Sequence, residues 1–138
     1  MNWKTDRILA KLVLDSELEN IKVIDQFIYD LKKVYHIDNQ KFVDIRLSIL
    51  EAVNNAIIHG NQLDSSKKVL ISETLDDNVL MIYVEDQGLG FDPSKVQDPT
   101  RKSDLSLPGG RGIHLMRHLA DRLDFLKGGQ SVLLRFQL

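Results

Sequence analysis

The order of hydrophobic patterns along the chain constrains its fold more than any other feature. Apolar residues recur every three or four positions in three segments, which predicts amphipathic helices at residues 18–36, 38–59 and 109–120. Alternating or β-branched stretches predict strands at residues 7–14, 68–74, 79–85, 123–126 and 131–138. This order lacks the regular alternation of βαβ units. It predicts an α+β fold, a two-layer α/β sandwich with a mixed, largely antiparallel sheet and about three helices on one face.

Short local signals mark several element ends. Ser16 with Glu19 three positions later predicts a capping box before the first helix. Asp38 is expected to cap the second helix, and Gly60 to end it. Residues 76–78, Asp-Asp-Asn, predict a hairpin between two strands.

Composition limits the class of protein. A length of 138 residues fits one domain, residues 1–138, and a net charge of −2 gives no general reason to bind nucleic acid or acidic lipid. The chain has no cysteine, which excludes disulfides and thiolate metal sites. It also lacks a signal-peptide pattern and an apolar run of the roughly 20 residues that cross a bilayer. We therefore expect a cytoplasmic protein without membrane contact.

The second helix carries a polar stripe beside its apolar face. Glu51 and Asn55 lie one turn apart on this stripe, so their side chains share a face. Carboxylate and amide oxygens are hard ligands, and magnesium takes few such protein ligands while keeping waters and phosphate oxygens. The alternative interpretation is a solvated helix face.

Two glycine-containing segments follow. Asp86, Gly88 and Gly90 form a turn after an apolar strand, where an acid could accept a hydrogen bond from an exocyclic amine such as that of adenine. The sequence from Pro108 to Ile113 precedes a helix, whose free N–H groups could bind an anion. Each segment alone is equally compatible with a simple turn or a loop-to-helix junction.

Other patterns are absent or weaker. His114 and His118 have the i, i+4 spacing of a metal pair, but no further ligand cluster accompanies them. The chain has no Walker-type phosphate loop, no Rossmann glycine motif and no Gly-x-Ser-x-Gly nucleophile turn. Residues 91–108 hold all three prolines, which predicts a long, mobile loop.

Taken together, residues 51–61, 86–92 and 109–116 resemble the GHKL ATPases, and most closely the stand-alone anti-sigma-factor serine kinases of the RsbW type. The resemblance implies the Bergerat, or histidine-kinase-like, fold with ATP and Mg²⁺ as cofactors. It implies that Asn55 holds magnesium and that Glu51 is the general base for a substrate serine or threonine. Asp86 would contact the adenine amine, in a pocket shaped by Gly88 and Gly90.

The resemblance also assigns the remaining site positions. Residues from about 92 to 108 would form the ATP lid, and Ser131 falls where relatives often carry a threonine near the aspartate. Gly110 and Gly112 would meet the phosphates, and Gly109, Arg111 and Ile113 would also belong to the ATP-binding residues. Relatives often place an arginine just before the final glycines, whereas this chain has Ser106, Leu107 and Pro108 there.

The function that the resemblance implies is a protein serine/threonine kinase that acts as an anti-sigma factor. Its expected partners are a STAS-type anti-anti-sigma protein, a sigma factor and, in a homodimer, a second copy of the chain. Two alternatives stay open. One is a nucleotide-gated binding module without kinase turnover, and the other is the catalytic domain of a sensor histidine kinase.

Overall fold

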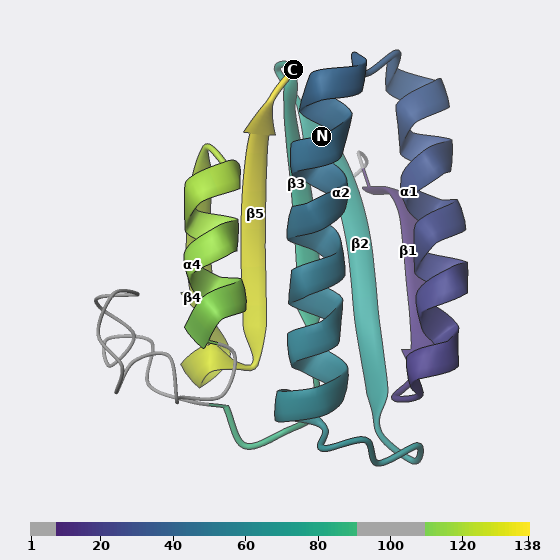
Figure 1. Cartoon of the computed structure of the whole chain (residues 1–138), viewed down its shortest axis with the longest axis vertical. Coiled ribbons are helices and arrows are strands. Elements are labelled where there is room, and N and C mark those ends of the chain that lie inside the picture. The colour runs from purple at the N-terminus through teal and green to yellow at the C-terminus, as the bar shows by residue number, and fades with distance from the viewer. Residues whose placement is uncertain (1–7, 91–109) are drawn as a thin grey trace, which may run out of the picture.

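A computed structural model of the chain describes residues 8–90 and 110–138 (Figure 1). Five strands form one sheet in the order β1-β2-β3-β5-β4, and all four pairings are antiparallel. The strands are β1 (Ile8–Asp15), β2 (Lys68–Asp76), β3 (Val79–Glu85), β4 (Arg122–Leu126) and β5 (Ser131–Gln137). The α+β sandwich expected from the sequence is confirmed, with these five strands antiparallel throughout.

Three α-helices cover the same face of the sheet, with α2 in the middle (Figure 1). They are α1 (Ile21–Tyr35), α2 (Asn39–Asn54) and α4 (Gly110–Leu119). Helix α2 continues directly into η3, a π-helical turn at Asn55–Gly60, while η2 (Leu18–Asn20) and η5 (Lys127–Gly129) are short 3-10 turns. None of the helices within residues 8–90 and 110–138 has both the length and the apolar content needed to cross a bilayer.

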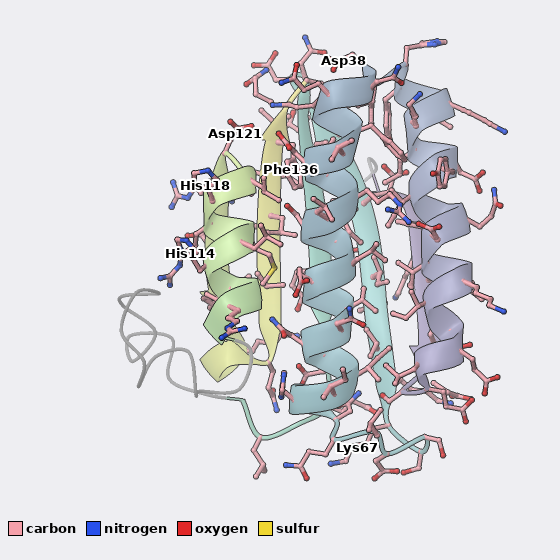
Figure 2. The ribbon with its side chains drawn as sticks, in the orientation of Figure 1. Asp38, Lys67, His114, His118, Asp121 and Phe136 are labelled. Carbon is pink, nitrogen blue, oxygen red and sulfur yellow. The ribbon has the colours of Figure 1, made fainter. Side chains whose placement is uncertain are left out.

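The core lies between the sheet and the helices. Strand alternation turns Leu80, Ile82 and Val84 of β3 toward the helical layer, where each is 2% exposed or less. Figure 2 shows Phe136 of β5 in the same layer, between its strand and α2, and it is fully buried. Burial of large side chains at about 25 cal/mol per Å² of apolar surface is the main stabilising contribution to such a fold.

The cap at the start of α2 is confirmed. Asp38 has extended backbone angles, and its Oδ1 accepts a hydrogen bond of 2.9 Å from the backbone N–H of Lys41.

The capping box expected at Ser16 is wrong. Ser16 is completely buried at the end of β1, and its hydroxyl donates to the carbonyl of Lys67 at 2.8 Å. Helix α1 instead starts at Ile21 after the η2 turn, whose capping residue Glu17 makes no side-chain cap bond. Because the Ser16 hydroxyl donates to Lys67, far along the sequence, it does not cap the nearby end of the helix.

Gly60 ends the helical segment, but not through a left-handed cap. The left-handed residues after the helix are Gln62 and Leu63, with φ of 53° and 60°. Two left-handed residues, Asp77 and Asn78, likewise close the β2–β3 hairpin, with φ of 52° and 61°, as a type I′ turn requires. The hairpin predicted from residues 76–78 is thus confirmed.

Candidate functional site

The three sequence motifs meet at one end of the sandwich. This end contains the η3 turn after α2, the end of β3, the start of α4 and the tip of the β4–β5 hairpin (Figure 1). Figure 2 shows Lys67 at this end and Asp38 at the opposite one. At three places in this region, a glycine lets two chain segments lie closer together than any other residue would allow.

The first approach joins α4 to α2. A Cβ atom added to Gly112 would lie 2.6 Å from Oε2 of Glu51 and 3.1 Å from Nδ2 of Asn55. Any residue other than glycine would therefore push these side chains aside or move α4 away. The structure brings the first motif and the third motif into direct contact at this position.

Glu51 and Asn55 are half-buried, and they lie on the side of α2 that faces the start of α4. Within the described residues, no hydrogen bond or ion pair engages either side chain. Their oxygen atoms are therefore available to a ligand. Asn55 is also the first residue of the π turn, a local departure from α-helix that occurs often at functional sites.

The second approach joins the end of η3 to the turn after β3. A Cβ on Gly60 would lie within 3.0 Å of the carboxyl atoms of Asp86, and a Cβ on Gly88 would collide with the Gly60 carbonyl. Gly60, the last residue of the helical segment, thus also allows the close approach of the aspartate.

Asp86 has a defined set of partners. Its Oδ1 accepts a 2.8 Å hydrogen bond from the N–H of Gly88. Burial raises the pKa of Asp86 above its usual range, although the Gly88 bond opposes this shift by favouring the charged form. Since Oδ1 is engaged, Oδ2 is the oxygen that remains to accept a bond from a ligand.

Asn61 is a residue whose role the sequence did not indicate. It is fully buried, and its Nδ2 donates to Ser16 Oγ at 2.7 Å and to the Lys68 carbonyl at 2.9 Å. Its Oδ1 accepts the N–H of Gln87 at 2.7 Å. One amide therefore ties the ends of β1 and β2 to the turn at residues 86–90.

The third approach places Gln130, rather than Ser131, beside that turn. A Cβ on Gly90 would collide with the Gly128 carbonyl and would lie 3.5 Å from Cγ of Gln130. The hydroxyl of Ser131 instead accepts a 3.0 Å hydrogen bond from Tyr83, on the sheet face away from the helices. The structure does not bring the Ser131 side chain to Asp86, because neighbouring residues of a strand point to opposite faces.

The other predicted phosphate-contacting residues lie at the start of α4 or before it. Gly110 is the first helical residue and Arg111 is exposed, whereas the Ile113 side chain is 2% exposed and belongs to the core. Ile113 can therefore offer only its backbone N–H, in the first turn of α4. Gly109 and the expected lid at residues 92–108 lie outside the described residues.

His114 and His118 lie on the outer side of α4 and point away from the sheet (Figure 2). Their ring centroids are 6.4 Å apart. Among the described residues, no group of three or more His, Cys, Asp or Glu side chains is arranged to hold a metal ion.

Comparison with known proteins gives three findings. Residues 14–136 match the histidine kinase-like ATPase domain. The chain is 35% identical over 88 residues to an anti-sigma F factor of Clostridium perfringens, covering 62% of each chain. It is 30% identical over 105 residues to an anti-sigma F factor of Shouchella clausii, covering 72% of this chain and 71% of the relative.

A third relative and a solved structure extend this picture. The anti-sigma F factor of Bacillus subtilis is 37% identical over 84 residues, which cover 59% of this chain and 57% of the relative. Matches to several of these curated relatives thus span about three fifths of their length. The RsbU and RsbW domains of a Mycobacterium tuberculosis protein align with 94% of this chain and 31% of that chain, with a TM-score of 0.67. At 17% identity, this last likeness concerns the fold alone.

Proposed function

Because this chain belongs to the histidine kinase-like ATPase family, in its RsbW-like branch, we propose that it is an ATP-dependent serine/threonine kinase and anti-sigma regulatory factor. The observation that supports this most is the contact of three separate motifs around one end of the sandwich. The names of the anti-sigma F factors support the regulatory part of the proposal.

The proposed base site is centred on Asp86. Its free carboxylate oxygen would accept a hydrogen bond from the amine of adenine, which guanine replaces with a carbonyl oxygen. The glycine contacts at Gly60, Gly88 and Gly90 fix the turn without side chains in the space where a base would approach. The half-buried position strengthens a charge-assisted bond, because water competes less there.

The residues near Gly112 fit a magnesium-bound triphosphate. Glu51 and Asn55 supply hard oxygen atoms, and the start of α4 supplies free N–H groups and the positive end of the helix dipole. Gly112 keeps that space open, since a Cβ would fill it. We propose that Asn55 holds Mg²⁺, which neutralises phosphate charge when bound, and that the N–H groups of residues 110–113 contact phosphate oxygens.

Glu51 is the proposed general base. It would accept the proton of a substrate serine or threonine hydroxyl as the hydroxyl oxygen bonds to the terminal phosphorus and the bond from that phosphorus to the departing ADP breaks. Its neighbour Asn55 and the helix start at Gly112 would hold the two reacting groups close together, and such positioning is one of the main contributions to phosphoryl transfer.

We propose a STAS-type anti-anti-sigma protein as the substrate and a sigma factor as the competing partner. Phosphate on the substrate would add about −1.5 to −2 charges. This charge would weaken docking beside Glu51 and release the kinase to the sigma factor. A homodimer is a further proposal, and sedimentation equilibrium measures it directly.

The kinase activity is tested by incubating the protein with γ-labelled ATP, Mg²⁺ and candidate STAS proteins. We expect label on a serine or threonine with the wild type, and a loss of about 100-fold or more with Glu51→Gln, which keeps the shape but cannot take the proton. Equal labelling by both proteins would remove Glu51 from the role of base. No labelling by the wild type, with ATP bound, would favour a nucleotide-gated binding module.

The magnesium role is tested by isothermal titration with ATP in the presence and absence of Mg²⁺. We expect Asn55→Ala to lose most of the magnesium-dependent part of the affinity, about tenfold or more. Its affinity for ATP without Mg²⁺ should stay close to that of the wild type. Equal magnesium dependence in both proteins would show that Asn55 does not hold the metal.

The binding-module alternative has one sequence observation in its favour. Before the final glycines, where relatives often carry an arginine, this chain has Leu107 and Pro108. The histidine-kinase alternative requires a separate dimerisation helix with a phosphoacceptor histidine. A search for such a helix in neighbouring genes is its direct check.

A further inference from the structure

Gln130 contacts the turn at residues 86–90 in three places. Its backbone carbonyl accepts the N–H of Asp86 at 2.9 Å, which extends the β3–β5 ladder by one bond. Its side-chain Nε2 donates to the carbonyl of Gly88. Its Cγ is the side-chain atom nearest to the Cβ position of Gly90. Gln130 therefore lies beside Asp86, Gly88 and Gly90, the first, third and fifth residues of the turn.

These contacts form a chain of hydrogen bonds that ends on a carboxylate. Gln130 fixes the carbonyl of Gly88, and the N–H of the same residue, Gly88, donates to Oδ1 of Asp86. Gly88 is buried, and a Cβ added to it would collide with the Gly60 carbonyl. The orientation of the Asp86 carboxylate thus depends on the Gln130 amide.

We propose that Gln130 is a positioning residue that makes the site selective for adenine over guanine. This inference rests on the proposed ATP site. A carboxylate oxygen attracts the amine of adenine and repels the carbonyl oxygen of guanine only if it is held in one direction. Gln130 supplies that restraint through Gly88 and does not itself contact the base.

The neighbouring turn residues cannot supply the same restraint. Gln87 is held by other partners, since its N–H donates to Asn61 and its Oε1 accepts the N–H of Lys68 at 2.7 Å. Leu89 is 98% exposed. Of the side chains that the structure describes, Gln130 is the one bonded to the Gly88 carbonyl.

The test is a Gln130→Met variant, which keeps the length of the side chain and removes the donor. We expect the dissociation constant for Mg-ATP to rise about tenfold, which corresponds to about 1.4 kcal/mol of binding free energy. The dissociation constant for Mg-GTP should stay the same, so the preference for ATP over GTP falls about tenfold. Isothermal titration gives both values.

The matched control is Gln137→Met, at the end of β5, the strand that directly follows Gln130. Its amide also donates to a backbone carbonyl, that of Asn78, at 3.3 Å, but at the far end of the sheet. We expect this variant to keep the wild-type preference for ATP. Equal losses in the two variants would show a general effect on β5 and would overturn the proposal.

A double-mutant cycle separates positioning from simple packing. In an Asp86→Ala background no oriented side-chain group remains to distinguish the two bases, so Gln130→Met should cause no further change in the ratio of ATP to GTP affinity. A merely structural Gln130 would weaken both nucleotides alike, with or without Asp86. That result would overturn the inference.

A ligand-free measurement distinguishes failure of this inference from failure of the proposed function. Gln130→Met should speed the hydrogen exchange of the Gly88 amide about tenfold, because its acceptor, Asp86, is no longer held. If the wild type binds neither nucleotide, the proposed function fails while the exchange rate still measures the hydrogen-bond chain. If the exchange rate is unchanged, the positioning link itself is refuted.

Discussion

The amide of Asn61 uses all of its polar groups where β1, β2 and the turn after β3 converge. Asn61→Ala would leave the Lys68 carbonyl and the Gln87 N–H without this partner. Because these groups lie in or near a buried cluster, we expect a loss of about 3 kcal/mol in the free energy of unfolding. Urea denaturation followed by circular dichroism measures it.

The control at the same scale is Gln40→Ala, which removes an exposed amide in the first turn of α2. Its effect should stay within about 0.5 kcal/mol. If the two variants lose the same stability, the buried network around Asn61 does not contribute as the contacts suggest.

Gly112 allows a prediction in which stability and binding separate. Gly112→Ala would place a Cβ 2.6 Å from the Glu51 carboxylate, so one of the two helices must shift or the side chain must turn. Alanine is also the better helix former by about 1 kcal/mol, which offsets part of the strain. We expect ATP affinity to fall about tenfold or more while the midpoint of thermal unfolding changes by only a few degrees. Unchanged affinity would place the phosphates away from the start of α4.

At the scale of elements, the cap of α2 is a contribution to stability that is remote from the site. Asp38→Ala removes the acceptor for the Lys41 N–H and should cost about 1 kcal/mol, whereas Asp38→Ser retains a capping oxygen. Thermal melts of the two variants measure the difference. Because Asp38 lies at the far end of α2 (Figure 2), neither change should alter ATP affinity, and a parallel loss of affinity would contradict this separation.

The elements were largely predictable from the sequence, because each follows from a local periodicity. The Asp38 cap and the Asp77–Asn78 turn are also local signals, and both are confirmed. The failure at Ser16 involves a long-range bond. Ser16 bonds to Lys67 across the fold instead of capping α1. Nothing in the local pattern reveals such distant partners.

The part of the candidate site that follows from local spacing was also predictable. Glu51 and Asn55 lie four positions apart, so they share one face of the helix independently of the tertiary fold. The residue beside Asp86 at the start of β5 was not predictable, because successive residues of a strand point to opposite faces and Gln130 and Ser131 are adjacent in the sequence. The register of β3 and β5 decides between them.

At the scale of the whole molecule, two acids connect stability to pH. Glu73 of β2 is 3% exposed, accepts a 2.8 Å bond from the Tyr35 hydroxyl, and has a pKa raised by burial. An acid with a raised folded pKa retains its proton longer in the folded chain than in the unfolded one. The free energy of unfolding should therefore decrease as pH rises from the ordinary glutamate pKa of 4.5 through the raised value. Asp86 has the same sign.

Glu73→Gln should remove the contribution of Glu73 to that pH dependence and stabilise the protein at neutral pH, since the amide need not be ionised in the core. Chemical denaturation at pH 4.5, 6 and 7.5 measures the slope. Asp77→Asn, an acid-to-amide change at an exposed turn, serves as the control and should keep the wild-type slope. A steep slope that persists in Glu73→Gln would assign the dependence to other groups.

Asp38 and the three motifs lie at opposite ends of the sandwich (Figure 2), and this separation is useful for attaching the protein to a surface. Since the natural chain contains no thiol, a single cysteine in place of exposed Gln40 would be its one attachment point for a dye or a solid support. A molecule tethered there would keep residues 51–61 and 86–90 turned toward the solution. Surface-immobilised protein could then be screened for nucleotides and partner proteins without obstructing the region under study.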